Sequence, residues 1–384
     1  MGQMTSRERV VTALEHREPD RVPFDCSFVY ESYLRIKDYL GLNPAREVRT
    51  SSPWLTISPP LELIDALAID LCYIGLRKPK DAPVFEYGMD TFTDEWGVEF
   101  KKTEQDSGLY YGFSNQVLEG ATVADLEDFP WPDPHNPELT EGLGEQAQEL
   151  YETTDLALVG KFSNSIFEQA FYMRGFEQLL LDLSFAPDFV EALLSKMVDL
   201  ALARLDVGLQ ACGRYIQAVR LAGDDMGQQD GPLMSPRMFR AQIKPHFSRY
   251  YGEARALIDR YNPRIKIIAH TDGDVYPIIP DYIEMGLDVL NPVQPYVAEM
   301  EHEKLKAEFG DRLAFHAGID IQKVMPFGTP EEVAAEALKT MRALGPGGGY
   351  ILAPTHYLQA DVPPENVIAL RDAVLEHGGY PLSE

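Results

Sequence analysis

The chain has 384 residues, of which 45% are apolar, enough for the core of one large domain. Its 61 acidic and 34 basic residues give a formal net charge of −27, which repels nucleic-acid phosphates and anionic membranes. We therefore expect neither as a partner. No run of 18 apolar residues and no apolar leader are found, which favours a soluble cytoplasmic protein. The three cysteines, Cys26, Cys72 and Cys212, have no zinc-finger spacing and are interpreted as reduced core residues.

Eight short β-rich segments follow one another along the chain, and each tends to end at polar residues. They are residues 21–27, 69–75, 155–164, 215–225, 264–272, 287–295, 312–320 and 348–356. Between many of them lie stretches with apolar residues every three to four positions, such as 175–213 and 329–345, which is the spacing of helices. Thr329, Pro330 and Glu332 form a helix start, and Ser235 with Pro236 forms another.

Alternating strands and helices predict an α/β fold, and eight such units predict a (β/α)8 TIM barrel. An open doubly wound sheet is the alternative, but no GxGxxG or P-loop motif follows any of the strands. Residues 80–150 interrupt the alternation with turns and a proline-rich stretch, which predicts a β-hairpin and loop insertion across the barrel mouth, where it can act as a lid. With no linker or internal repeat, we expect a single domain over residues 1–384.

Polar residues at the carboxyl ends of barrel strands converge on one cavity, so the strand ends supply the candidate site. They are Asp25, Asn164, Glu168, Asp224, Asp225, His270, Asp272, Asn291, Gln294, His316, Asp320 and His356. Three of the chain's eight histidines, His270, His316 and His356, occupy such positions. This clustering favours an enzyme over a barrel that serves as a binding module, which remains the third hypothesis.

The motif His270-Thr271-Asp272 places a histidine and a carboxylate on the same side of an extended segment. With His356 as a third ligand, they would form a two-histidine, one-carboxylate set for a divalent metal such as zinc, with a position left open for water or substrate. The alternative is that the two side chains simply bond to each other or to nearby loops.

Asp224 and Asp225 are adjacent, so only one of them can face the cavity while the other caps a loop or pairs with Arg220 or a neighbouring helix. We assign Asp225 to the cavity, where crowding of acids would raise a pKa and suit a proton donor or acceptor. A solvated loop start is the alternative for this pair.

Four stretches of the sequence resemble the uroporphyrinogen decarboxylase-like superfamily. They are "MTSRERVVTALEHREPDRVPFD" (4–25), "HTDGDVYPIIPDYIEMGLDVLNPVQP" (270–295), "FGDRLAFHAGIDIQKVMPFGTPEEV" (309–333) and "GGYILAPTHYLQADVPPENVIAL" (348–370). The resemblance implies a (β/α)8 barrel and one of two activities, cofactor-free uroporphyrinogen decarboxylation or corrinoid-dependent methyl transfer, the latter including aromatic O-demethylases.

Departures from the family motifs favour the methyltransferase branch. The decarboxylases carry an Arg-Gln-Ala-Gly-Arg-Tyr motif after the first strand, where this chain reads "CSFVYESYLR", and their essential aspartate falls at or near Arg77 here. The thiol-methylating enzymes bind zinc through a His-x-Cys motif and a later cysteine. Asp272 and His356 replace those two thiolates, which leaves a harder centre better suited to polarising an oxygen.

We therefore predict a methyltransferase that moves a methyl group from a small O-methyl donor to the Co(I) centre of a corrinoid (cobalamin), either free or carried by a partner protein. Asp225 and His316 would be catalytic, Asp25, Asn164, Asn291 and Gln294 would contact the donor, and His270, Asp272 and His356 would hold zinc or another divalent metal. A metal-free, decarboxylase-like lyase is the alternative. The resemblance leaves the oligomer open between a monomer and a homodimer.

Overall fold

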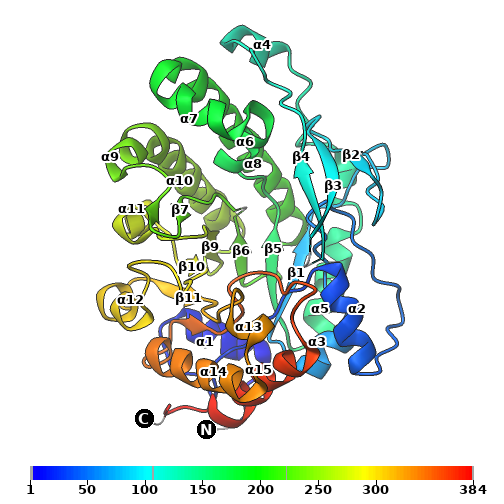
Figure 1. Cartoon of the computed structure of the whole chain (residues 1–384), viewed down its shortest axis with the longest axis vertical. Helices are drawn as coiled ribbons and strands as arrows, with labels where there is room; N and C mark the ends of the chain where they lie inside the picture. Colours follow the sequence, from blue (N-terminus) through cyan, green and yellow to red (C-terminus); the bar gives the residue numbers. More distant parts are fainter. Residues whose placement is uncertain (1–2, 106–107, 222, 383–384) are drawn as a thin grey trace.

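The computed structural model describes residues 3–105, 108–221 and 223–382 and shows an α/β fold built on a curled, parallel sheet of seven strands (Figure 1). The strand order is β1-β5-β6-β9-β10-β11-β12, which follows the chain. The strands are β1 (Leu71–Gly75), β5 (Ala157–Lys161), β6 (Ala218–Arg220), β9 (Lys266–His270), β10 (Val289–Asn291), β11 (Ala314–His316) and β12 (Tyr350–Ile351). Each lies inside one of the eight segments predicted from the sequence.

The remaining predicted strand, residues 21–27, lies between the two edge strands of the sheet without forming a full strand. Phe24 makes a parallel bridge to Leu352, just after β12, and the Asp70 amide, just before β1, donates to the Phe24 carbonyl at 2.8 Å. This segment therefore contacts both edges, and the fold is TIM-barrel-like with seven regular strands instead of the expected eight.

Helices cover the outside of the sheet, as the alternating pattern predicts. The α-helices are α1 (Ser6–Leu14), α2 (Tyr30–Tyr39), α3 (Leu61–Leu67), α4 (Val123–Asp128), α5 (Leu143–Thr153), α6 (Phe167–Arg174), α7 (Phe176–Phe185), α8 (Pro187–Cys212), α9 (Pro236–Met238), α10 (Lys244–Tyr261), α11 (Ile279–Met285), α12 (His302–Phe309), α13 (Val324–Phe327), α14 (Pro330–Leu344) and α15 (Pro364–His377). Short 3-10 turns occur at Pro137–Thr140 and Tyr276–Ile278, and a π-helical turn joins α9 to α10 at Phe239–Ile243.

The predicted helix starts have the expected caps. Thr329 accepts a hydrogen bond from the Glu332 amide while Glu332 bonds back to the Thr329 amide, and Ser235 accepts from the Met238 amide. The predicted helical stretch 175–213 is two helices, because the chain breaks at Ala186, where Pro187 starts α8.

A separate apolar cluster fills the inside of the curled sheet. It contains one or two residues from each strand and two from α1, and consists of Val10, Leu14, Leu71, Ala157, Val159, Ala218, Ile268, Val289, Ala314 and Ile351. Helix α1 therefore closes the amino-terminal end of the strands, the end at which both chain termini lie (Figure 1). The carboxyl ends of the strands remain for the site, as in a barrel.

The segment 80–150 carries a three-stranded antiparallel sheet, larger than the hairpin expected from its turns. Its strands are β2 (Thr91–Thr93), β3 (Glu99–Gln105) and β4 (Gly108–Phe113), in the order β2-β3-β4. A second small hairpin pairs β7 (Gly227–Gln228) with β8 (Gly231–Pro232) after β6. The three-stranded sheet stands beside the barrel, and α4 extends beyond it (Figure 1).

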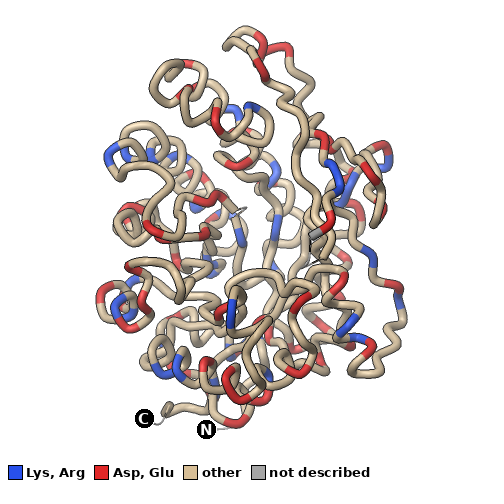
Figure 2. The backbone as a smooth tube through the Cα atoms, in the orientation of Figure 1, with Lys and Arg blue, Asp and Glu red and all other residues tan. Residues whose placement is uncertain are grey.

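Acidic residues are distributed over the outer helices and loops, interspersed with basic ones (Figure 2). None of the helices among the described residues combines the length and apolarity needed to cross a membrane.

Candidate active site

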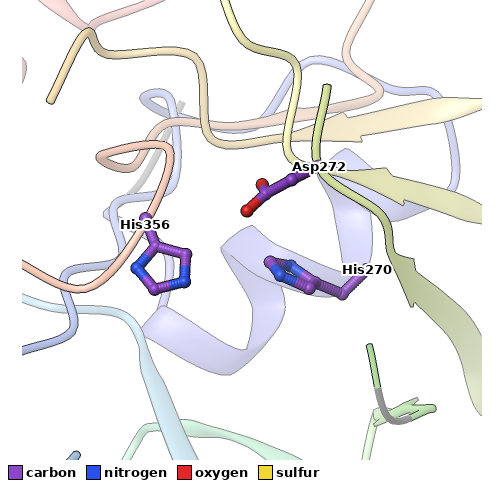
Figure 3. Close-up of side chains that lie close together, drawn as sticks. All are labelled: His270, Asp272 and His356. Carbon is purple, nitrogen blue, oxygen red and sulfur yellow. The ribbon is translucent and has the colours of Figure 1, made fainter. Parts of the chain in front are cut away.

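The three predicted metal ligands come together at the carboxyl end of the sheet. His270 ends β9, Asp272 follows two residues later, and His356 lies on the loop after β12. One ligand atom from each of the three lies within 4.8 Å of the other two, and the two imidazole rings are 6.1 Å apart between centroids. Figure 3 shows the three side chains pointing toward a common point. Asp272 and His356, 84 positions apart in the sequence, thus join His270 in one group of the size that a metal ion requires.

Local backbone geometry explains why this group forms where it does. The strand ends at His270, and Gly273 has a φ of +83°, which a residue with a Cβ rarely adopts. A Cβ on Gly273 would lie 2.2 Å from the Gly227 backbone, so the chain can turn closely past the β7 hairpin only with glycine here. The turn directs Asp272 back over the strand ends.

A chain of buried polar side chains fixes the orientation of His270. Its Nδ1 lies 2.7 Å from the Oδ1 of Asn291, which is at the end of β10, and the Nδ2 of Asn291 lies 3.2 Å from the Nδ1 of His316. A hydrogen bond from Nδ1–H to the amide oxygen leaves the Nε2 lone pair of His270 free for a ligand. Asn291 therefore supports the histidine, and it also lines the small chamber described below.

Burial sets the charge of the three ligands. It lowers the pKa of His270 well below its usual value, aided by the positive charge of Arg220, and it lowers the pKa of His356 to about 4. Both imidazoles are thus neutral near pH 7, the form that binds metals. Burial and the neighbouring Asp225 raise the pKa of Asp272 to about 8. A divalent cation would add to the countercharge that Arg220 alone supplies to this carboxylate, so the donor set fits such an ion.

The two adjacent aspartates have different positions. Asp224 accepts hydrogen bonds from the amides of Ile166, Phe167 and Glu168 and so caps the amino-terminal end of α6. Asp225 lines the cavity described below, and its Oδ1 accepts a hydrogen bond of 2.8 Å from the Asp272 amide. Their side chains therefore point to different surroundings, as expected for adjacent residues of an extended chain.

A cavity of about 470 Å³ opens beside the three ligands and is lined by His270, His356, Asp225 and Glu168. Aromatic residues form much of its wall; they are Trp54, Tyr110, Tyr111, Tyr172 and Tyr357. Burial, together with the charges of Asp225 and Asp224, raises the pKa of Glu168 to about 9. The cavity can therefore accept a small, flat molecule and offers a protonated carboxyl group at neutral pH.

Below this cavity, a small chamber of about 30 Å³ is lined by Arg220 and Tyr357, and Lys161 contacts Tyr357; the sequence did not single out Lys161 or Tyr357. Lys161 Nζ donates to the Tyr357 hydroxyl at 3.0 Å, and Lys161 and Arg220 together outweigh burial and lower the pKa of Tyr357 to about 8. Lys161 is the last residue of β5 and Tyr357 follows His356. Their strand-end positions were the signal that could have identified them.

Asp25 and His316 lie in this lower chamber and not among the three ligands. His316 Nε2 is 3.1 Å from the Oδ2 of Asp25, which also accepts a hydrogen bond of 2.6 Å from the Tyr73 hydroxyl. Burial alone would raise the pKa of Asp25, but the contacts with His316 and Tyr73 outweigh it and lower that pKa. His316 is linked to His270 through the side chain of Asn291.

The two predicted amide residues Gln294 and Asn164 differ in position. Gln294 Nε2 lies 3.2 Å from the Oδ1 of Asp272, so it contacts a candidate ligand. Asn164 donates to the carbonyl of Ser165 at 2.8 Å and lies 3.4 Å from that of Met197 in α8, and it lines neither of the two cavities. The structure thus turns Asn164 away from the site, because its backbone has already left the strand at Lys161.

A TIM-barrel-like fold with a polar cavity at the carboxyl ends of its strands is typical of an enzyme. A model of the family described as "Uroporphyrinogen decarboxylase (URO-D)" matches residues 107–377, more than half of the chain. The protein belongs to the uroporphyrinogen decarboxylase family. Members of the superfamily are enzymes and include decarboxylases and methyltransferases.

Individual relatives are distant. A uroporphyrinogen decarboxylase of Magnetococcus marinus is 25% identical over 196 residues, which cover 50% of each chain. One from Aromatoleum aromaticum is 32% identical over 191 residues, 50% of this chain and 49% of that protein, so the chain spans about half the length of the curated relatives it matches. The solved structure of a methyltransferase from Methanosarcina mazei is 20% identical, covers 97% of this chain and 99% of its own, and has a TM-score of 0.66, which shows a shared fold.

Proposed function

We propose that the protein is a corrinoid-dependent methyltransferase that takes a methyl group from a small O-methyl donor and passes it to a reduced corrinoid, either free or carried by a partner protein. The observation that carries the proposal is the convergence of His270, Asp272 and His356, without a sulfur ligand, beside the 470 Å³ cavity. Nitrogen and oxygen ligands suit an ion that polarises an oxygen more than one that activates a thiol. The fold shared with a methyltransferase also supports this branch.

In this reaction the bond between the methyl carbon and the donor oxygen breaks, and the carbon bonds to the cobalt of the reduced corrinoid, which supplies the electron pair. The oxygen leaves with the electrons of the broken bond and needs a proton. A divalent cation held by the three ligands would stabilise the negative charge that develops on this oxygen.

The protein's own residues bind the donor and supply the proton. Glu168 and Asp225 line the cavity, and because the pKa of Glu168 is raised to about 9, one proton is held there at neutral pH. Gln294 holds Asp272, and Asn291 holds His270 in the orientation that presents Nε2. Tyr110 and Tyr111 of β4 form part of the cavity wall, so the three-stranded sheet would exclude water on that side.

A second candidate function is a metal-free lyase that acts on a carboxylated substrate. Lys161 and Arg220 are cations close to Tyr357 at the base of the site, where they can neutralise one carboxylate. The decarboxylase relatives also favour this reading. A metal-free lyase assigns no role to the converging ligand atoms of His270, Asp272 and His356, and we therefore prefer methyl transfer.

The two functions are distinguished by one assay with free cob(I)alamin and a panel of methoxylated donors. Methyl transfer predicts donor-dependent conversion of the cob(I)alamin absorption spectrum to that of methylcobalamin. Both His270→Ala and His356→Ala should reduce the rate by about 10² or more, because each removes a ligand. His377→Ala is the matched control, since His377 is exposed at the end of α15.

Corrinoid-independent release of CO2 from carboxylated substrates, with no methylcobalamin formed from any donor, would support the lyase instead. Equal methyl-transfer rates in His270→Ala and His377→Ala would contradict the role of the three ligands while leaving methyl transfer itself in place.

A further inference from the structure

A second cavity, of about 320 Å³, lies between the three-stranded sheet and the barrel, and the proposed methyl transfer does not use it. Six parts of the chain line it: the loop around Trp54, the segment that follows β1 at Arg77 and Lys78, the β2–β3 hairpin, the 3-10 turn at Leu139, and helices α6 and α8. Pro53 and Trp54 also line the 470 Å³ cavity and so form the partition between the two.

The walls of this second cavity are aromatic. Phe92, Trp96 and Phe100 are at most 6% exposed, and the Trp54 ring meets the Phe100 ring edge-on with centroids 5.6 Å apart. Such walls bind flat, apolar rings through stacked or edge-on contacts. The apolar part of a ligand here is therefore expected to be aromatic.

Two buried donors of the cavity are unsatisfied, whereas Lys78 already donates to the Ser51 carbonyl. Among the described residues, no hydrogen-bond partner exists for the Nε of Arg204 or the Nε2 of Gln169, although both atoms are buried. Buried donors without partners are rare and usually mark a missing ligand or water. Guanidinium and amide N–H groups are the donors that match a planar carboxylate.

The charges also favour an anion. Three cationic side chains, Arg77, Lys78 and Arg204, line the cavity of a protein whose net charge is −27. Two acids line it as well, but Glu95 is already paired with Arg204 Nη2 at 2.9 Å. Asp94 accepts from the amides of Trp96 and Val98, which commits its Oδ1 to the turn between β2 and β3.

We propose that this cavity is a binding site for a small aromatic carboxylate, separate from the proposed methyl-transfer site. The ring lies among Phe92, Trp96 and Phe100, and the carboxylate accepts hydrogen bonds from Arg204 and Gln169 near the charge of Lys78. The site is next to the 470 Å³ cavity, because Gln169 follows Glu168 on α6 and each lines a different cavity. The proposal does not depend on methyl transfer.

Isothermal titration calorimetry with benzoate tests this site, with benzamide as a neutral ligand of the same shape. Benzoate should bind, and benzamide should bind at least about tenfold more weakly because it lacks the charge. Lys78→Met and Gln169→Leu should each weaken benzoate binding about three- to tenfold. Lys80→Met is the matched control, because Lys80 is two residues away, lines no part of this cavity and pairs with Glu138 and Glu141.

Gln169→Leu removes a buried donor that has no partner, so its melting temperature should not fall, and weaker binding in this variant cannot be attributed to misfolding. His270→Ala should leave benzoate affinity unchanged. The proposal is overturned if benzoate does not bind at concentrations on the order of 10 mM, if benzamide binds equally well, if Lys78→Met and Gln169→Leu bind as the wild type does, or if His270→Ala abolishes binding.

Discussion

Both ends of the curled sheet contain buried carboxylates, but the two ends differ in how many cations and hydrogen-bond donors surround those carboxylates. At the amino-terminal end, Asp70 is fully buried and accepts hydrogen bonds from Arg9 at 2.6 Å, Arg21 at 2.7 Å, Ser6 at 2.7 Å and the Phe24 amide at 2.8 Å. Two cations and two neutral donors surround one acid. These contacts compensate the charge of Asp70, so we expect them to stabilise the fold at this end of the sheet.

At the carboxyl end, three acids lie close together with much less compensation. Burial raises the pKa of Glu168, Asp225 and Asp272, and for Asp272 the opposing cation is Arg220. Clusters of buried acids with raised pKa values are typical of functional sites, where the acids bind a cation or transfer a proton. Buried acids are therefore expected to stabilise the fold at the amino-terminal end and to take part in chemistry at the carboxyl end. The number of neighbouring cations and donors, and not burial, distinguishes these two roles.

The largest effect is expected at the stability end. Asp70→Ala would remove the carboxylate that Arg9 and Arg21 share, leaving Arg9 with Asp20 as its remaining acidic partner, and should reduce the free energy of unfolding by about 3–5 kcal/mol. Urea denaturation measures this loss. Asp65→Ala, at an exposed position of α3, is the control and should change stability by less than about 0.5 kcal/mol. A similar small change in both variants would show that the Asp70 network does not stabilise the fold.

A smaller effect, on metal affinity and not on stability alone, is expected beneath the ligands. Asn291→Leu removes the hydrogen bond that orients His270 and should weaken binding of Zn²⁺ about 10- to 100-fold. Asn115→Leu serves as the control, because Asn115 also makes two hydrogen bonds, to Glu99 and Gly97, but in the three-stranded sheet. Equal zinc affinities in the two variants would show that Asn291 does not support His270 as a metal ligand.

The smallest effect concerns the pH dependence of stability. The raised pKa of Glu168 means that the folded state binds a proton the unfolded state has released, so the unfolding free energy of metal-free protein falls as pH rises from about 5 to about 9. Glu168→Gln removes this cost and should stabilise the protein by about 1–2 kcal/mol at pH 8, with little gain at pH 4.5. Urea denaturation in EDTA at several pH values measures it. An unchanged pH slope in the variant would mean that Glu168 ionises normally.

Much of the fold followed from the sequence because parallel strands buried on both faces have a recognisable pattern. Seven predicted segments contain a regular strand, and Thr329 and Ser235 cap helices as expected. The segment 21–27 is not a regular strand, because its backbone makes isolated hydrogen bonds to the chain near β1 and near β12 instead of a continuous ladder with one of them. Such partners are distant in sequence and leave no local signal.

The sequence was enough to predict that the site residues lie at the ends of strands, but not to predict the direction in which each side chain points. His270 and Asp272 share a face by their spacing, and His356 joins them at the carboxyl end of the sheet. Asn164 also follows a strand, yet it bonds to Ser165 because the chain turns there into α6. Lys161 was overlooked although it ends β5; its strand-end position was a signal for the site, but the sequence does not show that it contacts the Tyr357 hydroxyl.

The proposed function depends on His270, Asp272 and His356 holding one divalent ion. X-ray absorption spectroscopy on zinc-loaded protein, combined with metal analysis after dialysis, tests it most directly. We expect one zinc per chain in a shell of nitrogen and oxygen ligands that includes two imidazoles, with the metal lost in His270→Ala and in His356→Ala and retained in His377→Ala. Protein that retains no zinc, or zinc that remains bound in all three variants, would contradict it.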